Sequence, residues 1–144
     1  MNTILLVHLG ATWGLVGLIW FVQLVHYPLF ASVGTSEFAD YEARHTSRTA
    51  WVVAAFMPAE ALTASWLLVD SPEGVSAALI AVGLVLVALV WMSTALWQAP
   101  LHGRLSNGYT TALHRRLVQS NWLRTGLWTG RGVLVLVMAG QALA

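Results

Sequence analysis

The sequence predicts an all-α protein, an up-down four-helix transmembrane bundle with helical cytoplasmic extensions. Hydrophobic residues make up 58% of the 144 residues and charged residues only 9%, whereas about a quarter of the residues of a soluble domain are charged. Four apolar stretches are each long enough to cross a hydrocarbon core, which takes about 20 helical residues. Most of the charged residues lie between these stretches rather than within them.

One short and two long connectors separate the four predicted spans. The spans are residues 3–26, 49–69, 75–97 and 121–142. The short connector, residues 70–74, has the sequence Asp-Ser-Pro-Glu-Gly and predicts a tight turn. The chain is too short for a second domain of this kind, so we expect residues 1–144 to form a single four-helix transmembrane domain.

The basic residues predict the orientation of the spans. All seven are arginines, and most of them lie in or beside the long connectors. These are Arg44, Arg48, Arg104, Arg115 and Arg116. The short connector carries two acidic residues and no basic one. Because cytoplasmic loops are enriched in Arg and Lys, we expect the long connectors inside and both termini outside, with the protein in a cytoplasmic membrane.

The composition and the missing motifs also exclude several classes of function and partner. The chain has no cysteine, which excludes disulfides and thiolate metal sites, and its net charge of +1 gives no reason to expect nucleic acid. It contains neither a P-loop nor a GxSxG elbow, which argues against phosphoryl transfer and serine hydrolysis. The expected partner is the lipid bilayer, and a homo-oligomer or a larger membrane complex is also possible. Gly10 and Gly14 have the spacing of a helix-association motif, although packing within the bundle is the favoured explanation.

Both long connectors are expected to be partly helical. Residues 35–51 contain no Gly or Pro and begin with Thr35 or Ser36 as a possible N-cap, so the second helix should project into the cytoplasm. Residues 107–125 begin with an Asn-Gly turn and then place leucines one helical turn apart beside His and Arg. This pattern predicts an amphipathic interfacial helix that leads into the fourth span.

Each predicted span carries its polar residues along one face. His8 and His26 are 18 residues apart, which is five turns of a helix, so they share a face with Thr12 and Gln23. Pro58 is expected to kink the second helix. The polar face of the second helix carries His45, Thr49, Glu60 and Thr63. That of the third carries Thr94, Gln98 and His102, and that of the fourth carries Asn121, Arg124, Trp128 and Arg131. Because lipid cannot satisfy polar groups, all four faces should point inward.

A buried charge group is expected at the middle of the bundle. Counting helical residues inward from the cytoplasmic border places His8, Glu60 and Arg131 at similar depths. An isolated charge there costs at least a few kcal/mol, whereas a paired one is tolerated, and Glu60 is the only acidic residue within a predicted span. We therefore predict a Glu60–Arg131 ion pair with His8 hydrogen-bonded to it. The group could fix helix register only, or it could handle a proton or a ligand.

Four of the five histidines should collect at the cytoplasmic end, on different helices or their extensions. They are His26, His45, His102 and His114. Neutral imidazoles bind transition metals and haem, so this end is a candidate metal, haem or ligand site. The expected polar lining consists of Gln23, Tyr41, Gln98, Asn121 and Arg124. At least two of the histidines should approach closely enough to share a metal, water or ligand in a common cavity, although simple headgroup contacts remain an alternative.

Three stretches carry a resemblance to known proteins. The sequences VHYPLF, QAPLHGRL and SNWLRTGLWTGRG resemble those of an uncharacterised family of small bacterial four-helix membrane proteins, and the resemblance covers nearly the whole chain. The layout is more distantly similar to that of anthrone-oxygenase-like membrane proteins, whose members act on polycyclic aromatic or quinoid substrates. The first resemblance implies the fold, and the second implies redox chemistry.

Three functions follow as hypotheses, and the sequence identifies no catalytic residue. A membrane-bound oxidoreductase would use the histidine cluster with a transition metal or haem to oxidise a lipophilic aromatic or quinol. A small transporter or binding protein would use the group of His8, Glu60 and Arg131. A packing subunit of a larger membrane complex would use its glycines for close helix contact.

Overall fold

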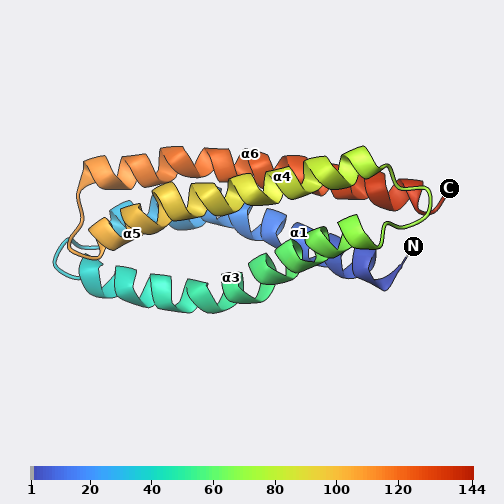
Figure 1. The fold of residues 1–144 in the computed structure, drawn as a ribbon. Helices are drawn as coiled ribbons and strands as arrows, with labels where there is room; N and C mark the ends of the chain where they lie inside the picture. Colours follow the sequence, from blue (N-terminus) through green and yellow to red (C-terminus); the bar gives the residue numbers. More distant parts are fainter. Residues whose placement is uncertain (1) are drawn as a thin grey trace.

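The computed structural model describes residues 2–144, which form four long helical rods without a strand. Figure 1 shows the rods side by side, with both termini at one end. The rods consist of α1 (Thr3–Phe21), η1 (Val22–His26), α2 (Tyr27–Leu29) and η2 (Phe30–Ser32); α3 (Phe38–Val69); α4 (Ala77–Ser93), η3 (Thr94–Gln98) and α5 (Ala99–Leu105); and α6 (Thr111–Gln141). The predicted all-helical fold class is confirmed.

The rods pack in a closed ring of neighbours. Helix α1 contacts α3 and α6, and α4 contacts the same two helices from the other side. Residues 33–37 and 106–110 connect rods at one end, which we call the connector end (Figure 1). Residues 70–76 connect rods at the opposite end, which also holds the termini and which we call the terminal end.

Three rods are long and apolar enough to cross a membrane: Thr3–Ser32, Phe38–Val69 and Ala77–Leu105. Helix α6 is equally long but less apolar, because its central part carries Arg124 and Arg131. The fourth predicted span, residues 121–142, therefore does not stand out by hydropathy. Both of its arginines are nevertheless buried against the other rods, with 7% and 0% of their surface exposed.

The surface of the bundle is apolar and its interior is partly polar. Large hydrophobic side chains point outward from every rod, for example Leu24, Leu62, Val85 and Val133, of which between 57% and 71% is exposed. Thirteen polar or charged residues are buried between the rods. The polar faces therefore point inward, as predicted, and the distribution is the reverse of that in a water-soluble domain.

Two rods contain a π-helical turn immediately before an X-Pro-Leu sequence. In η1 the N–H of Tyr27 donates to the carbonyl of Val22, and in η3 the N–H of Ala99 donates to the carbonyl of Thr94. A π turn holds one residue more than an α turn, so it lets the chain accommodate the proline that follows without leaving the helix.

Two predicted helix ends are wrong, because the helices continue past these π turns. The first and third spans were expected to end at residues 26 and 97, but the rods continue to Ser32 and Leu105. Each π turn also rotates the side chains after it relative to those before it. Gln23 before the first proline and Tyr27 beside it are both buried.

The predicted helical extensions are present, although one of them begins later than expected. Neither Thr35 nor Ser36 is the N-cap of α3, because both lie in a turn closed by the Glu37 N–H and the Gly34 carbonyl at 3.1 Å. The helix starts only after this turn, at Phe38. Helix α6 begins after Thr110, whose hydroxyl oxygen accepts a hydrogen bond from the Leu113 N–H at 3.3 Å.

Helix α3 is the rod that departs most from a straight line. Figure 1 shows it changing direction near its middle, and Pro58 lies within this helix. Two residues before the proline, Phe56 packs on Gly14 of α1, where an added Cβ would lie 2.8 Å from the Phe56 ring. Gly14 is therefore used for packing within the bundle, whereas a Cβ at Gly10 would meet nothing within 4 Å.

Candidate metal and ligand site

The structure brings His8, Glu60 and Arg131 together. The Arg131 Nε donates to Glu60 Oε1 at 2.8 Å, and neither side chain is exposed at all. An Arg131 terminal nitrogen lies 3.0 Å from His8 Nε2. The predicted ion pair and its histidine partner are both present.

His8, Glu60 and Arg131 make further hydrogen bonds to other protein groups. Thr12 and Trp128 each donate to one oxygen of the Glu60 carboxylate at 3.1 Å. Arg131 also donates to the Gly83 carbonyl of α4, and His8 Nδ1 lies 2.7 Å from the Thr63 hydroxyl. Residues of α1, α3, α4 and α6 all take part, so the group ties the four rods together at one level.

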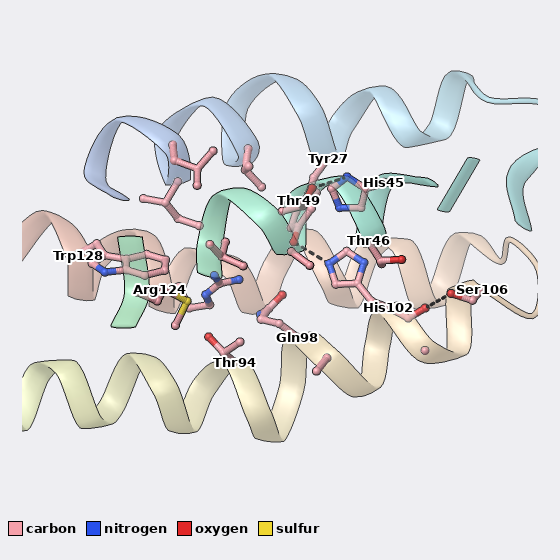
Figure 2. A pocket seen from close by; sticks show the side chains of 18 residues that line it. Tyr27, His45, Thr46, Thr49, Thr94, Gln98, His102, Ser106, Arg124 and Trp128 are labelled. Atoms are coloured by element: carbon pink, nitrogen blue, oxygen red, sulfur yellow. Dashed lines mark hydrogen bonds between the residues drawn. The ribbon is translucent and has the colours of Figure 1, made fainter. Parts of the chain in front are cut away.

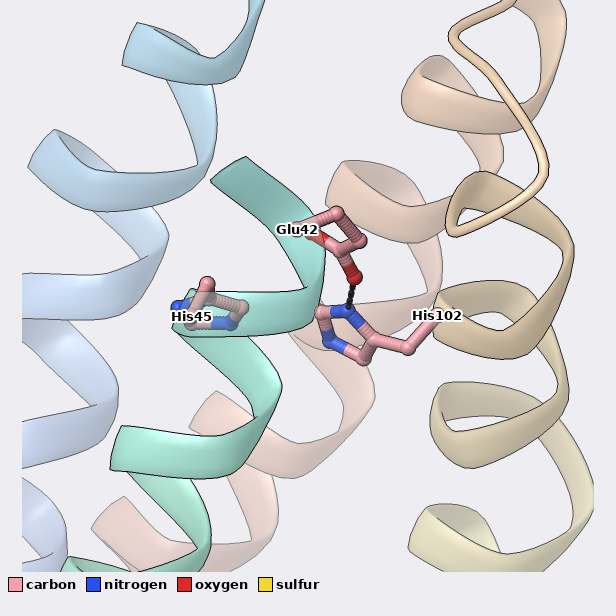
Figure 3. Close-up of side chains that lie close together, drawn as sticks. All are labelled: Glu42, His45 and His102. Carbon is pink, nitrogen blue, oxygen red and sulfur yellow. Dashed lines mark hydrogen bonds and ion pairs between the residues drawn. The ribbon is translucent and has the colours of Figure 1, made fainter. Parts of the chain in front are cut away.

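A second cluster lies toward the connector end. Glu42 and His45 of α3 and His102 of α5 each offer a ligand atom, and these atoms lie within 4.8 Å of one another. Figure 3 shows the Glu42 carboxylate beside the His102 ring, where His102 Nδ1 and Glu42 Oε1 are 2.5 Å apart. The Glu42 side chain is fully buried, and only 14% of the His102 side chain is exposed. The cluster is thus a set of two imidazoles and one carboxylate from two rods.

His26 joins this cluster through His45. His26 Nε2 lies 2.8 Å from His45 Nδ1, which also lies 3.2 Å from the Thr49 hydroxyl. The His45 and His102 rings are 5.3 Å apart between centroids. At least two of the four histidines therefore approach one another, as predicted, and of His26, His45 and His102 the last two line a common cavity.

Tyr27 completes the surroundings of His102. Its hydroxyl lies 2.8 Å from His102 Nε2, and its side chain is buried. Both ring nitrogens of His102 therefore have a partner, the Glu42 carboxylate on one side and the Tyr27 phenol on the other. Neither Glu42 nor Tyr27 was among the predicted site residues. The only sequence signal for Tyr27 was its place directly before Pro28, beside a histidine.

His114 does not belong to the cluster, contrary to the prediction. Its Nε2 lies 2.7 Å from the Tyr27 carbonyl oxygen and its Nδ1 lies 3.3 Å from the Tyr109 hydroxyl. Its ring stacks on that of Phe30 at 6.2 Å between centroids. The Nε2 contact thus attaches the start of α6 to the first rod, and the Nδ1 contact attaches it to the connector that precedes α6.

The predicted polar lining is only partly correct. Gln98 and Arg124 line the cavity beside His45 and His102. Gln23 and Asn121 instead form a buried chain next to it, because Asn121 donates to Gln23 at 2.8 Å and Gln23 donates to the Val118 carbonyl at 3.2 Å. Tyr41 is not part of the lining, since its ring packs edge-on against Phe30 at 5.5 Å.

The cavity has a volume of about 420 Å³ and lies between the four rods (Figure 2). Its wall is mainly apolar, with Leu18, Ile19, Val22, Val53 and Met57 on α1, η1 and α3. Its polar groups are the following: Tyr27, His45, Thr46, Thr49, Thr94, Gln98, His102, Ser106 and Arg124. Two of these residues carry a buried polar atom without a hydrogen-bond partner, Gln98 Oε1 and Arg124 Nε, and Glu42 Oε2 at the cluster is a third.

Comparison with protein-family models, curated proteins and solved structures finds no match for this chain. The functional argument therefore depends on the geometry of the cluster and the cavity.

Proposed function

We propose that the protein is a small integral membrane metalloprotein whose four rods cross the bilayer in up-down order. The connector end faces the cytoplasm and both termini lie outside. The apolar outer surface of all four rods supports this placement, and so do the arginines gathered at the connector end. Helix α6 crosses with the others because its arginines are turned into the bundle, where their charge does not meet lipid.

The cluster of Glu42, His45 and His102 is the proposed metal site, and its donor set is the observation that carries this proposal. Two imidazoles and one carboxylate with room for further ligands are typical of mononuclear non-haem iron sites and also suit other divalent first-row metals. Glu42 Oε2 has no hydrogen-bond partner, so this oxygen is free to bind an ion. The metal would replace the close contact between Glu42 and His102. We propose an ion rather than haem, because Glu42 and Tyr27 occupy the two sides of His102 that a macrocycle would need.

The substrate proposed for this centre is a lipophilic aromatic compound or quinol. The cavity supports this proposal, because its apolar wall adjoins His45 and His102. In the proposed oxidation a hydroquinone loses two electrons and two protons and becomes the quinone, and dioxygen takes both up and leaves as hydrogen peroxide. Tyr27 lines the cavity, and its hydroxyl, 2.8 Å from His102 Nε2, can pass these protons on.

Metal content tests the proposal directly. The detergent-purified protein should bind about one equivalent of Fe²⁺, Co²⁺ or Zn²⁺, measured by elemental analysis after equilibration and desalting. Glu42→Gln, His45→Ala and His102→Ala should each abolish this binding. His114→Gln is the matched control, because this histidine lies at the same end but outside the cluster. Wild-type protein that takes up no metal, or cluster variants that bind as the wild type does, would refute the metal site.

The alternative of a transporter or binding site at His8, Glu60 and Arg131 has less support. Glu60 and Arg131 have no exposed surface, His8 only 2%, and all three are hydrogen-bonded within the bundle. A group whose donors and acceptors are already hydrogen-bonded to protein has few left to bind a ligand. We propose that its role is structural.

A further inference from the structure

Arg124 is a buried cation without an anionic partner. Only 7% of its surface is exposed. A terminal nitrogen donates to the Asn121 side-chain oxygen at 3.3 Å, whereas its Nε has no partner. Arg131, seven residues further along α6, has its Glu60 carboxylate at 2.8 Å. Buried guanidinium groups are normally paired, so the unpaired donor of Arg124 indicates a missing acceptor.

Gln98 carries an acceptor that lacks a donor. Its side chain is 98% buried, with 2% exposed, and its Nε2 donates to the Ser120 hydroxyl at 3.0 Å. Its Oε1 accepts nothing. Figure 2 shows the side chains of Arg124 and Gln98 next to each other at the cavity. Both residues line the same cavity, so its wall holds one unpaired N–H and one unpaired carbonyl oxygen.

A single hydroxyl group satisfies both of these atoms. Its oxygen accepts a hydrogen bond from Arg124 Nε while its hydrogen is donated to Gln98 Oε1. A carboxylate only accepts, and its charge would face the unpaired oxygen of Gln98. A ketone or ether oxygen likewise leaves Gln98 without a donor. The pair is thus complementary to an alcohol or a phenol rather than to a fatty acid.

The surroundings favour an aromatic hydroxyl. The Arg124 guanidinium carbon lies 4.9 Å from the centroid of the Trp128 ring, and Trp128 lines the cavity. Apolar side chains of α1 and α3 form the opposite wall. A flat ring beside Trp128 with an apolar tail along this wall would fill the space.

We propose that Arg124 and Gln98 hold one hydroxyl of a lipophilic phenol or quinol in this cavity. The proposal rests on the substrate cavity of the proposed function but not on the metal at its other wall. The two residues thereby determine which ligand oxygen is recognised.

Ligand binding to metal-free protein tests this proposal. The probes are 4-decylphenol, its methyl ether and decanoate, titrated calorimetrically against detergent-purified protein treated with EDTA. The wild type should bind the phenol about tenfold more tightly than the ether, because only the phenol can donate to Gln98. Arg124→Met should weaken phenol binding by about tenfold or more. Gln98→Leu should remove the preference for phenol over ether.

Matched controls separate recognition from loss of folding. Arg116→Met and Gln119→Leu change exposed residues of the same types on α6 and should leave the affinity for the phenol unchanged. Because a misfolded variant loses both the phenol and the ether, the ratio of the two affinities in Gln98→Leu reports recognition alone. Wild-type protein that binds no probe, that prefers decanoate, or whose Arg124→Met variant keeps its phenol affinity would overturn the proposal. Metal uptake by Arg124→Met should remain as in the wild type, so a failure of the metal site is seen separately.

Discussion

Replacing one member of the Glu60–Arg131 pair should destabilise the bundle strongly. Glu60→Gln leaves the Arg131 guanidinium without an anionic partner, because the Gly83 carbonyl, His8 and the new amide carry no negative charge. Arg131→Met leaves the Glu60 carboxylate with only Thr12 and Trp128. Because both sites are fully buried, each change should cost about 3–5 kcal/mol, the range for an uncompensated buried charge.

The double replacement should recover much of this loss. A glutamine at position 60 still offers an oxygen to Thr12 or Trp128, and a methionine at position 131 fills most of the space of the arginine. The remaining cost is an unsatisfied group at one or two sites, roughly 1–3 kcal/mol. Additive losses would instead amount to roughly 6–10 kcal/mol. We therefore expect a coupling free energy of at least about 2 kcal/mol between the two positions.

Thermal unfolding of the four proteins in the same detergent measures this cycle. Each kcal/mol corresponds to roughly 2–4 °C in a chain of this size, so each single variant should melt about 10 °C lower than the wild type. The double variant should melt well above either single variant. Arg116→Met, which removes an exposed arginine from the same helix, should change the melting temperature little. Losses that simply add in the double variant would show that the two charges do not stabilise one another.

The remaining predictions concern packing, the cluster and orientation. Gly14→Val should lower the melting temperature because its Cβ would lie 2.8 Å from Phe56, whereas Gly10→Ala should be tolerated; equal melting temperatures would contradict the packing. Tyr27→Phe removes the hydroxyl bound to His102 and should weaken metal binding by about 10-fold to 100-fold while leaving one equivalent at saturation; unchanged affinity would exclude this role for the phenol. Reporter tags on either terminus should be accessible from outside intact cells, and labelling only after lysis would reverse the proposed orientation.

The group of His8, Glu60 and Arg131 could be predicted from the sequence, because it depends on how deep each residue lies in the membrane and on the lack of another acidic partner for Arg131. Counting residues along a helix gives depth to within about a turn, at 1.5 Å per residue. Lipid offers a guanidinium no partner, and Glu60 was the only acidic residue within reach of Arg131. Neither argument depends on the exact helix ends, so the Glu60–Arg131 pair is predicted correctly although several helix boundaries are wrong.

The cluster was predictable only in outline because it depends on helical phase. The π turns η1 and η3 each add one residue to a turn, which changes the face on which later residues lie. Contacts between helices do not follow from a regular repeat of 3.6 residues either, so Tyr27 was missed, and Tyr41, whose ring packs on Phe30, was assigned to the lining. His114 was placed with the other histidines by its level in the bundle, but its hydrogen bonds turn it toward Tyr27 and Tyr109.

The hydrogen bonds of α6 distinguish a structural layer from a ligand-binding layer. Asn121, Arg124, Trp128 and Arg131 share one buried face of this helix. Toward the terminal end of this face, the carboxylate of Glu60 and the guanidinium of Arg131 are held entirely by protein groups. Nearer the connector end, Arg124 Nε and Gln98 Oε1 lack partners around a cavity.

Trp128 belongs to both layers, because its N–H donates to Glu60 at 3.1 Å while its ring lines the cavity. The hydrogen bond from Trp128 to Glu60 of the ion pair therefore fixes the Trp128 wall of the cavity. If Trp128→Phe weakened phenol binding while the melting temperature fell only slightly, the hydrogen bond to Glu60 would be shown to orient that wall. Unchanged phenol affinity would instead show that the two layers act independently.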